Sequence, residues 1–291
     1  MKILVLGATG MLGSAILRAL QGHKNFEAWG TLRDPDGRRY FPISTHANLI
    51  HGVDVLDEGS LKRVFEQVQP HLVINCVGLI KQLETANDPL VVLPINAMFP
   101  HRLANQCKAF AARLIHISTD CVFSGRKGSY TESDPSDAED LYGKSKYIGE
   151  LSDLHHVLTL RTSIIGHELN SNYALIDWFL SQKEQVKGYV NAIFSGLPTV
   201  ELTRVMLDYV IPRPELFGLY HVAAKPVNKY ELLKLVAEIY GKKITIIPDE
   251  QIYIDRSLNA ERFKEATGYV APEWPELIEM MHRSHRLVGA P

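Results

Sequence analysis

The sequence predicts an α/β protein built as a Rossmann-type, doubly wound parallel sheet with a smaller C-terminal lobe. Residues 3–6 are apolar on both faces, as in a strand buried within a parallel sheet. A glycine-rich turn at 7–13 follows, and apolar residues then recur at helical spacing, at Met11, Leu12, Ala15, Ile16, Ala19 and Leu20. Short apolar runs continue to alternate with helix-period segments, which is typical of a sheet covered by helices on both faces.

The expected elements follow one another at short intervals through the first half of the chain. Strands are expected at 3–6, 26–32, 50–55, 72–77, 114–118 and 157–161. Helical patterns lie at 61–68 and, despite Pro94 and Pro100, at 90–110. A further helix carries Lys146 and Glu150 before the last of these strands.

The pattern loosens after about residue 162, where prolines and glycines become frequent. Further elements are expected at 173–183, 199–210, 228–240, 244–247 and 259–266, and a strand at 219–222 should return to the main sheet. We therefore expect a first domain at 1–162, with strands near 190–222 added to it, and a second lobe made mainly of 163–291.

Composition and charge narrow the class of protein. The chain has 291 residues, of which 46% are hydrophobic and 22% charged, as in an ordinary globular protein. Its net charge of −2 does not indicate a nucleic-acid binder. Three scattered cysteines do not make a disulfide framework, and neither a signal peptide nor an apolar run of roughly 20 residues is visible. We expect a cytoplasmic protein that is not embedded in a membrane.

The glycine turn predicts a dinucleotide site. Gly7, Gly10 and Gly13 follow a buried strand and precede an amphipathic helix, where backbone N–H groups and the helix dipole can hold a pyrophosphate. A tight turn without a ligand is the simpler alternative for glycines alone. The residues expected to line this end of the cofactor are Gly7, Thr9, Gly10, Met11, Leu12 and Gly13.

The ends of later strands are expected to contact the rest of the cofactor. Arg33 lies 20 residues after Gly13, where an arginine favours the 2′-phosphate of NADPH and an acidic residue favours NADH. Asp34 and Asp36 stand close by, so NADH is the alternative. Asp54 and Val55 should flank the adenine, and Cys76, Val77 and Gly78 should flank the ribose and nicotinamide.

Tyr142 and Lys146 predict a proton donor for carbonyl reduction. Residues four apart on a helix share a face, so the lysine cation can lower the tyrosine pKa from about 10 towards neutrality. The lysine can also hold the nicotinamide ribose. Thr119 ends the fifth expected strand and can hydrogen-bond the substrate oxygen, with Ser118 as the alternative. Together with the dinucleotide turn, this order of groups predicts a nicotinamide-dependent oxidoreductase.

These motifs resemble the extended branch of the short-chain dehydrogenase/reductase superfamily, and within it the dTDP-4-dehydrorhamnose reductase group. The resemblance rests on Ser-Thr-Asp-Cys-Val-Phe-Ser-Gly at 118–125, Tyr-Gly-Lys-Ser-Lys-Tyr-Ile-Gly-Glu at 142–150 and Leu-Arg-Thr-Ser at 160–163. It extends through Gly-Leu-Pro-Thr at 196–199 and Arg-Ser-Leu at 256–258, and so covers nearly the whole chain.

The resemblance implies an NAD(P)H-dependent reductase of the 4-keto group of a nucleotide-linked 6-deoxyhexulose, in deoxysugar and surface polysaccharide biosynthesis. It places Asn96 at an active-site asparagine of the superfamily and Ser118 beside the cofactor. It also places Lys81, Asp120 and Cys121 beside the sugar, and Arg256 as a candidate diphosphate ligand. The group usually has tyrosine where this chain has Cys121, which leaves the identity of the sugar open.

Alternative functions remain at this stage. The same fold hosts nucleotide-sugar epimerases and dehydratases, although the glutamate that dehydratases usually add after the aspartate is replaced by Cys121. A non-catalytic NAD(P)-binding regulatory subunit is a further alternative. The histidines do not show a third ligand at metal spacing, so no metal site is expected. A homodimer is left open as the assembly.

Overall fold

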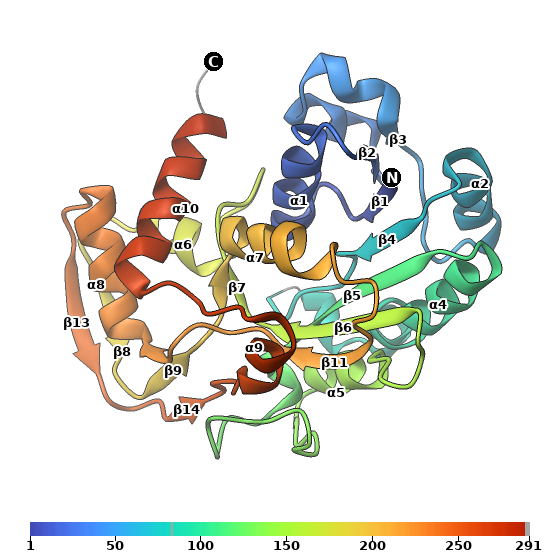
Figure 1. Ribbon diagram of the computed structural model, residues 1–291. Helices are drawn as coiled ribbons and strands as arrows, with labels where there is room; N and C mark the ends of the chain where they lie inside the picture. Colours follow the sequence, from blue (N-terminus) through green and yellow to red (C-terminus); the bar gives the residue numbers. More distant parts are fainter. Residues whose placement is uncertain (83, 289–291) are drawn as a thin grey trace. The chain divides into compact units, whose positions relative to one another are not determined.

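Seven strands form the main sheet of the computed structural model, which describes residues 1–82 and 84–288 (Figure 1). Their order across the sheet is β11-β6-β5-β4-β1-β2-β3, and the pairings from β3 to β5 are parallel. This confirms the expected Rossmann-type α/β fold. The strands are β1 (Lys2–Leu6), β2 (Glu27–Thr31), β3 (Leu49–Ile50), β4 (Leu72–Asn75), β5 (Arg113–Thr119), β6 (Val157–Thr162) and β11 (Gly218–His221).

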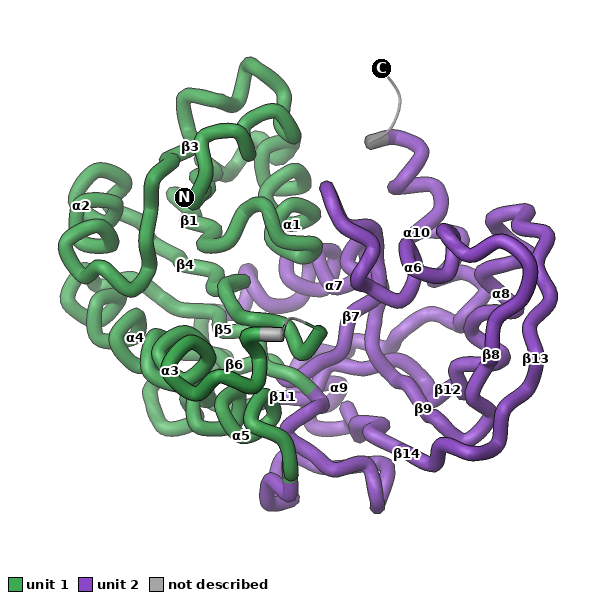
Figure 2. Tube along the Cα trace, turned by 180° about the vertical axis from the view of Figure 1, so that it is seen from behind, with its two compact units in different colours: residues 1–119, 138–160, 214–219 green, residues 120–137, 161–213, 220–291 purple. Residues whose placement is uncertain are grey.

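The chain divides into two compact units that interleave along the sequence (Figure 2). Unit 1 comprises residues 1–119, 138–160 and 214–219, and unit 2 comprises 120–137, 161–213 and 220–291.

Five α-helices lie in the described part of unit 1, and three of them begin at a side-chain cap. Asp57 accepts a hydrogen bond from the Gly59 N–H at 2.9 Å to begin α2, and Asp88 accepts one from the Leu90 N–H at 2.9 Å to begin α3. The helices are α1 (Met11–Gln21), α2 (Glu58–Val68), α3 (Pro89–Val92), α4 (Phe99–Ala109) and α5 (Leu141–Ile148).

Two expected elements differ in detail from those observed. The strand expected at 50–55 is β3 (Leu49–Ile50) alone, and Gly52 shortly after it takes a positive φ of 70°, outside the extended conformation of a regular strand. The helix expected at 90–110 is continuous but contains a π-helical segment, Leu93–Met98, between α3 and α4. The strand expected at 219–222 is found as β11 in the main sheet.

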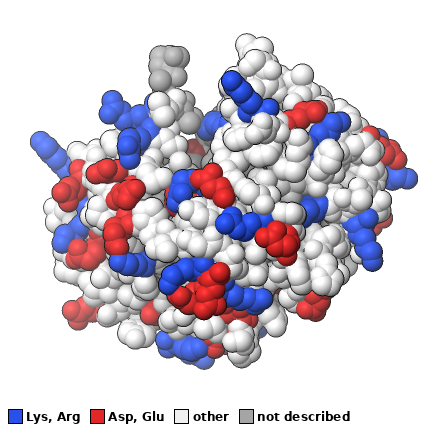
Figure 3. All heavy atoms as spheres, in the orientation of Figure 1, with Lys and Arg blue, Asp and Glu red and all other residues white. Residues whose placement is uncertain are grey.

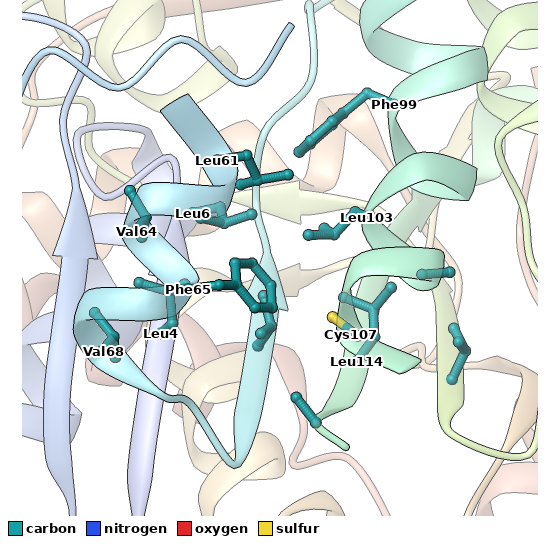
Figure 4. Packing of buried hydrophobic residues seen from close by; sticks show 14 of the residues in the cluster. Leu4, Leu6, Leu61, Val64, Phe65, Val68, Phe99, Leu103, Cys107 and Leu114 are labelled. Atoms are coloured by element: carbon teal, nitrogen blue, oxygen red, sulfur yellow. The ribbon is translucent and has the colours of Figure 1, made fainter. Parts of the chain in front are cut away.

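The core of unit 1 explains why the strands of the sheet are apolar on both faces (Figure 4). Leu4 and Leu6 of β1 pack with side chains of α2 and α4. The alternate residues Ile3 and Val5 point to the opposite face and are also buried, because helices cover both sides of a parallel sheet. The residues labelled on α2 and α4 in Figure 4 are Leu61, Val64, Phe65, Val68, Phe99, Leu103 and Cys107.

Unit 2 combines short sheets with helices of its own. In it β10 pairs with β7, β13 with β8, and β9 with both β12 and β14. Its strands are β7 (Ile164–Ile165), β8 (Gln185–Tyr189), β9 (Ala192–Phe194), β10 (Leu197–Pro198), β12 (Val227–Asn228), β13 (Thr245–Asp249) and β14 (Ile254–Asp255). Its helices are α6 (Leu175–Ser181), α7 (Thr199–Val205) with a π-helical continuation (Met206–Val210), α8 (Lys229–Tyr240), α9 (Glu261–Thr267) and α10 (Trp274–Val288).

The surface shows both signs of charge. On the face seen in Figure 3, lysine and arginine side chains are interspersed with aspartate and glutamate side chains. Among the described residues, no helix combines the length and the apolar character that crossing a membrane requires.

A buried polar cluster around Arg161 and His221 contacts the 120–137 segment of unit 2. The Arg161 guanidinium lies over the Phe123 ring, at 5.1 Å from its centroid, and its Nη1 lies 3.3 Å from Nε2 of His221. Nδ1 of His221 lies 3.0 Å from the Tyr130 carbonyl oxygen, and Glu132 accepts a hydrogen bond from the His221 N–H at 2.7 Å. Burial and the Arg161 charge lower the pKa of His221 to about 3.

We predict that this histidine makes the protein sensitive to acid. The unfolded chain protonates an imidazole near pH 6.5, whereas the folded protein does so only near pH 3, so stability is lost as the pH falls below about 6.5. The loss is about 2 kcal/mol between pH 6.5 and pH 5. Urea unfolding at several pH values should therefore show a weaker pH dependence for His221→Gln than for the wild type. The exposed His51→Gln serves as the control, and an unchanged dependence in His221→Gln would contradict the prediction.

Candidate active site

The glycine turn has the geometry that a dinucleotide site needs. Gly7 adopts a positive φ of 79°, and its carbonyl accepts a hydrogen bond from the Gly10 N–H at 3.0 Å. A Cβ atom on Gly13 would lie 2.1 Å from the Gly7 oxygen, so only glycine fits there. Helix α1 begins directly after Gly10, which supplies no side-chain cap. The N–H groups in the first turn of α1 can therefore donate hydrogen bonds to a phosphate. The turn thus suits the pyrophosphate of a dinucleotide.

The segments around this turn contact it closely. A Cβ on Gly7 would lie 3.2 Å from the Cys76 backbone and from the Val77 side chain, and the Val77 N–H donates to Oδ1 of Asn75 at 3.0 Å. On the β2 side, Gly37 approaches the Thr9 methyl group so closely that its Cβ would lie 2.8 Å away. The loops that follow β4 and β2 thus lie beside the glycine turn, as the sequence predicts.

The charged residues after β2 have different surroundings. Asp34 begins the 3-10 turn Pro35–Tyr40, and its Oδ1 accepts a hydrogen bond from the Asp36 N–H at 2.9 Å. Arg33 is exposed. Asp54 likewise caps a turn, since its Oδ1 accepts from the Leu56 N–H at 2.9 Å. The capping role of Asp34 makes it less suited than Arg33 to contact a ribose substituent.

Asn96 lies on the π-helical segment and orders the loop after β4. Its Oδ1 accepts a hydrogen bond from the Leu79 N–H at 2.9 Å, and its Nδ2 donates to the Leu79 oxygen at 3.2 Å and to Ser145 Oγ at 3.3 Å. A Cβ on Gly78 would lie 3.8 Å from Nζ of Lys146. The asparagine therefore holds Gly78 beside the lysine, and π-helical segments often occur at such functional positions.

Helix α5 carries the expected proton donor and its lysine. Asp140 caps the helix by accepting from the Gly143 N–H at 2.7 Å, and Tyr142 lies in the first turn. Lys146 is only 6% exposed and donates from Nζ to the Ile117 oxygen of β5 at 2.8 Å. Burial lowers the pKa of this ammonium to about 8, which leaves it mostly protonated at neutral pH.

Glu150 is a site residue that the motif analysis did not assign. Oγ of the buried Ser118 donates to its Oε1 at 2.6 Å. The Ser118 proton is therefore engaged by Glu150 within the protein. The sequence does contain a signal for Glu150, because it lies four residues after Lys146.

Lys81, which is expected beside the sugar, forms an ion pair with the residue that caps α5. Its Nζ lies 2.5 Å from Oδ2 of Asp140, the residue that caps α5. The loop after β4 and the start of the helix that carries Tyr142 are thus joined by an ion pair. Both side chains are partly exposed, so the pair contributes at most about 1 kcal/mol to stability.

The expected substrate residues of unit 2 lie near one another. Asp120 is buried at the start of the 3-10 turn Asp120–Val122. Arg256 donates from Nε to the Phe123 oxygen at 2.7 Å, and its Nη1 lies 3.9 Å from Sγ of Cys121. A Cβ on Gly125, which has a positive φ of 90°, would lie 3.1 Å from the Arg256 side chain. The stem of the arginine therefore lies close to the Gly125 backbone.

Two further features lie outside these residues. A cavity of about 300 Å³ is lined by parts of α6, β8 and α8, and includes none of the expected site residues. Within residues 1–82 and 84–288, no group of three or more histidine, cysteine, aspartate or glutamate side chains is arranged to hold a metal ion.

The fold and the cofactor turn define an extended short-chain dehydrogenase/reductase-type protein. The model of the RmlD substrate binding domain matches residues 1–284, and the chain belongs to this family. It is 32% identical over 252 residues to methionine adenosyltransferase 2 subunit beta of Bos taurus, covering 82% of this chain and 72% of the relative. It is 24% identical to dTDP-4-dehydrorhamnose reductase of Shigella flexneri, covering 97% of both chains.

The solved structures agree on the fold. The dTDP-4-dehydrorhamnose reductase of Bacillus anthracis, solved in complex with NADP, superimposes with a TM-score of 0.78 at 20% identity. The match covers 97% of this chain and 99% of the Bacillus anthracis chain. The predicted resemblance is thereby confirmed at the level of family and fold.

We predict that Tyr142→Phe removes most of the oxidoreductase activity. The substitution deletes only the phenolic hydroxyl, and loss of a general acid costs about 10² to 10⁴ in rate. Turnover and NADPH affinity should be measured together, since affinity is expected to change little. Tyr147→Phe, on the same helix but 46% exposed, is the control and should behave like the wild type. Near-normal turnover in Tyr142→Phe would show that another group supplies the proton.

Proposed function

We propose that the protein is an NADPH-dependent reductase of the 4-keto group of a nucleotide-linked 6-deoxyhexulose, acting in deoxysugar and surface polysaccharide biosynthesis. The observation that carries the proposal is the buried Lys146, held by the Ile117 carbonyl one helical turn from Tyr142. Membership of the RmlD family and the likeness to dTDP-4-dehydrorhamnose reductases support the choice of a sugar substrate.

The side chains perform the following steps in this proposal. NADPH, when bound, supplies the hydride to the substrate carbon. Tyr142 donates its phenolic proton to the carbonyl oxygen as that oxygen becomes negative. Lys146 stabilises the resulting phenolate by its charge, and Thr119 donates a hydrogen bond to the same oxygen.

The cofactor is held by unit 1 in this proposal. Arg33 pairs with the 2′-phosphate, and the first turn of α1 receives the pyrophosphate. The NADP complex of the Bacillus anthracis reductase supports NADPH as the cofactor. The remaining cofactor-binding residues are Gly7, Thr9, Gly10, Met11, Leu12, Gly13, Asp54, Val55, Cys76, Val77, Gly78, Asn96, Ser118, Tyr142 and Lys146.

We predict that Arg33→Ala weakens NADPH binding far more than NADH binding. Only NADPH carries the 2′-phosphate, and a hydrogen bond to a charged group contributes about 1.5 to 3 kcal/mol. Dissociation constants for both cofactors, measured by fluorescence titration, give the comparison. Arg63→Ala, which removes an exposed arginine of α2, should affect neither. Equal weakening of both cofactors by Arg33→Ala would rule out recognition of the phosphate by Arg33.

The substrate is a sugar nucleotide, with Arg256 as a ligand of its diphosphate. Nε of Arg256 donates to the Phe123 carbonyl and Nη1 lies against Sγ of Cys121, and the guanidinium has further N–H groups that can pair with phosphate oxygens. Lys81, Asp120 and Cys121 are proposed to contact the sugar. Contacts to the nucleotide, far from the reacting carbon, help to position that carbon for reduction.

We predict that Arg256→Ala raises KM strongly for a nucleotide-linked 4-keto-6-deoxysugar. Loss of one charge-assisted contact of about 1.5 to 3 kcal/mol corresponds to a rise of roughly ten-fold to a hundred-fold. Loss of NADPH absorbance should be followed with dTDP-linked and UDP-linked sugars and with the free sugar. Arg262→Ala, an exposed arginine of α9, is the control. Comparable kcat/KM values for free and nucleotide-linked sugars would refute the sugar-nucleotide proposal.

A second candidate is a nucleotide-binding subunit of a larger assembly. It is favoured by the likeness to methionine adenosyltransferase 2 subunit beta, which covers 82% of this chain. The same absorbance assay separates the two, because a subunit without reductase chemistry would bind NADPH but consume none with any sugar of the panel. An epimerase or dehydratase would convert the sugar with no net use of NADPH.

The proposal also covers the cellular location and the oligomeric state of the protein. We propose a cytoplasmic protein, since nucleotide sugars and NADPH are cytoplasmic metabolites, with a homodimer as the expected assembly. Light scattering of the purified protein measures the mass directly, and a mass of 32.7 kDa in solution would rule out the dimer.

A further inference from the structure

Lys146 combines two properties that oppose each other. The residue is buried, which disfavours the charged form of an amine. Its action on Tyr142 nevertheless requires the charged form. Burial outweighs the neighbouring charges and lowers the pKa of Lys146 to about 8, so the loss of a nearby negative charge would leave less of the amine protonated at working pH. A neighbouring negative charge is therefore needed.

The groups around Lys146 differ in their ability to supply that charge. Burial raises the pKa of the Cys76 thiol, directly after β4, to about 12, so it is neutral at pH 7. His116 of β5 is buried, and its pKa lies well below the usual value, so it is neutral as well. Tyr142 is the proton donor itself. Glu150 is the carboxylate whose charge favours the protonated lysine.

The position of Glu150 is tightly defined. The Ser118 hydroxyl donates to its Oε1 at 2.6 Å, and its N–H donates to the Tyr147 oxygen at 3.1 Å. The preceding residue, Gly149, passes so close to the π-helical segment that a Cβ would lie 2.0 Å from the Asn96 oxygen. The end of α5 is thus pressed against a neighbouring backbone, which fixes where the next side chain starts.

We propose that Glu150 is a positioning residue for the catalytic lysine: its carboxylate, oriented by Ser118, is the counter-ion that keeps Lys146 protonated. In this proposal Ser118 donates its hydrogen bond to the Glu150 carboxylate and not to the substrate. Thr119 is the hydroxyl that contacts the substrate oxygen. The inference deepens the proposed reductase function, but its main test needs neither substrate nor turnover.

The test measures the titration of Lys146 directly. The protein is labelled with [13C]lysine, the Cε signal of Lys146 is assigned by its loss in Lys146→Met, and its shift is followed by NMR from pH 6 to pH 10. The wild-type midpoint should lie near 8. Glu150→Gln keeps an oxygen acceptor for Ser118 but removes the charge, and should lower the midpoint by about 1 pH unit.

Matched variants distinguish the effect of the Glu150 charge from the effect of a change in structure. Ser118→Ala leaves the carboxylate in place and should lower the midpoint by less than Glu150→Gln does. Glu66→Gln, an exposed residue of α2, should not move it. If Glu150→Gln fails to fold, Glu150→Asp retains the charge on a shorter side chain and should still lower the midpoint, by a smaller amount. A midpoint that stays at the wild-type value in a folded Glu150 variant would overturn the proposal.

The pH profile of activity provides a second measurement. In Glu150→Gln the alkaline decline of kcat/KM should begin about 1 pH unit lower than in the wild type. A uniform loss of activity at every pH, with an unshifted Lys146 midpoint, would mean that Glu150 acts only in packing. Absence of reductase activity in the wild type would refute the proposed function and leave the NMR result unaffected.

Discussion

The arrangement of the candidate active site depends on the hydrogen bond from Nζ of Lys146 to the Ile117 carbonyl, 2.8 Å long. It joins α5 to the end of β5, and so places the helix that carries Tyr142 beside the strand that carries Ser118 and Thr119. A buried ammonium is costly unless its hydrogen bonds and charge are satisfied. The Ile117 carbonyl accepts one hydrogen bond from the ammonium, and the Glu150 carboxylate is the proposed source of the opposite charge.

Glycines give the cofactor side of the site its shape. At Gly13 and Gly149 the backbone of one segment passes so close to another that a Cβ would lie 2.1 Å and 2.0 Å from a carbonyl oxygen. The first approach brings the start of α1 against the turn, and the second brings the end of α5 against the π-helical segment. Asn96 then links this segment to the loop after β4. Close backbone approaches at glycines and the side chain of Asn96 together fix the loops on this side of the site.

The relatives of this chain bear different names although they share the fold. Methionine adenosyltransferase 2 subunit beta and dTDP-4-dehydrorhamnose reductase both match over most of the chain, and solved structures of a dehydratase and an epimerase superimpose on it as well. A shared fold therefore does not choose among these functions. The proposal of a reductase rests on the groups around Tyr142 and Lys146, and the nature of the sugar depends on positions such as Cys121.

The sequence by itself determined the fold, because alternating buried strands and amphipathic helices leave a strong periodic pattern. It also determined the family, because the glycine turn and the Tyr142–Lys146 pair are recognised from the local spacing of their residues. It also indicated that the chain near 219–222 returns to the main sheet. Only the tertiary structure decided which partner each polar group meets. The Ser118–Glu150 bond joins residues 32 apart and the Lys81–Asp140 pair joins residues 59 apart. The short β3 and the π-helical segment were also not predictable, because a positive φ at Gly52 and a local change of helical pitch leave no periodic signal.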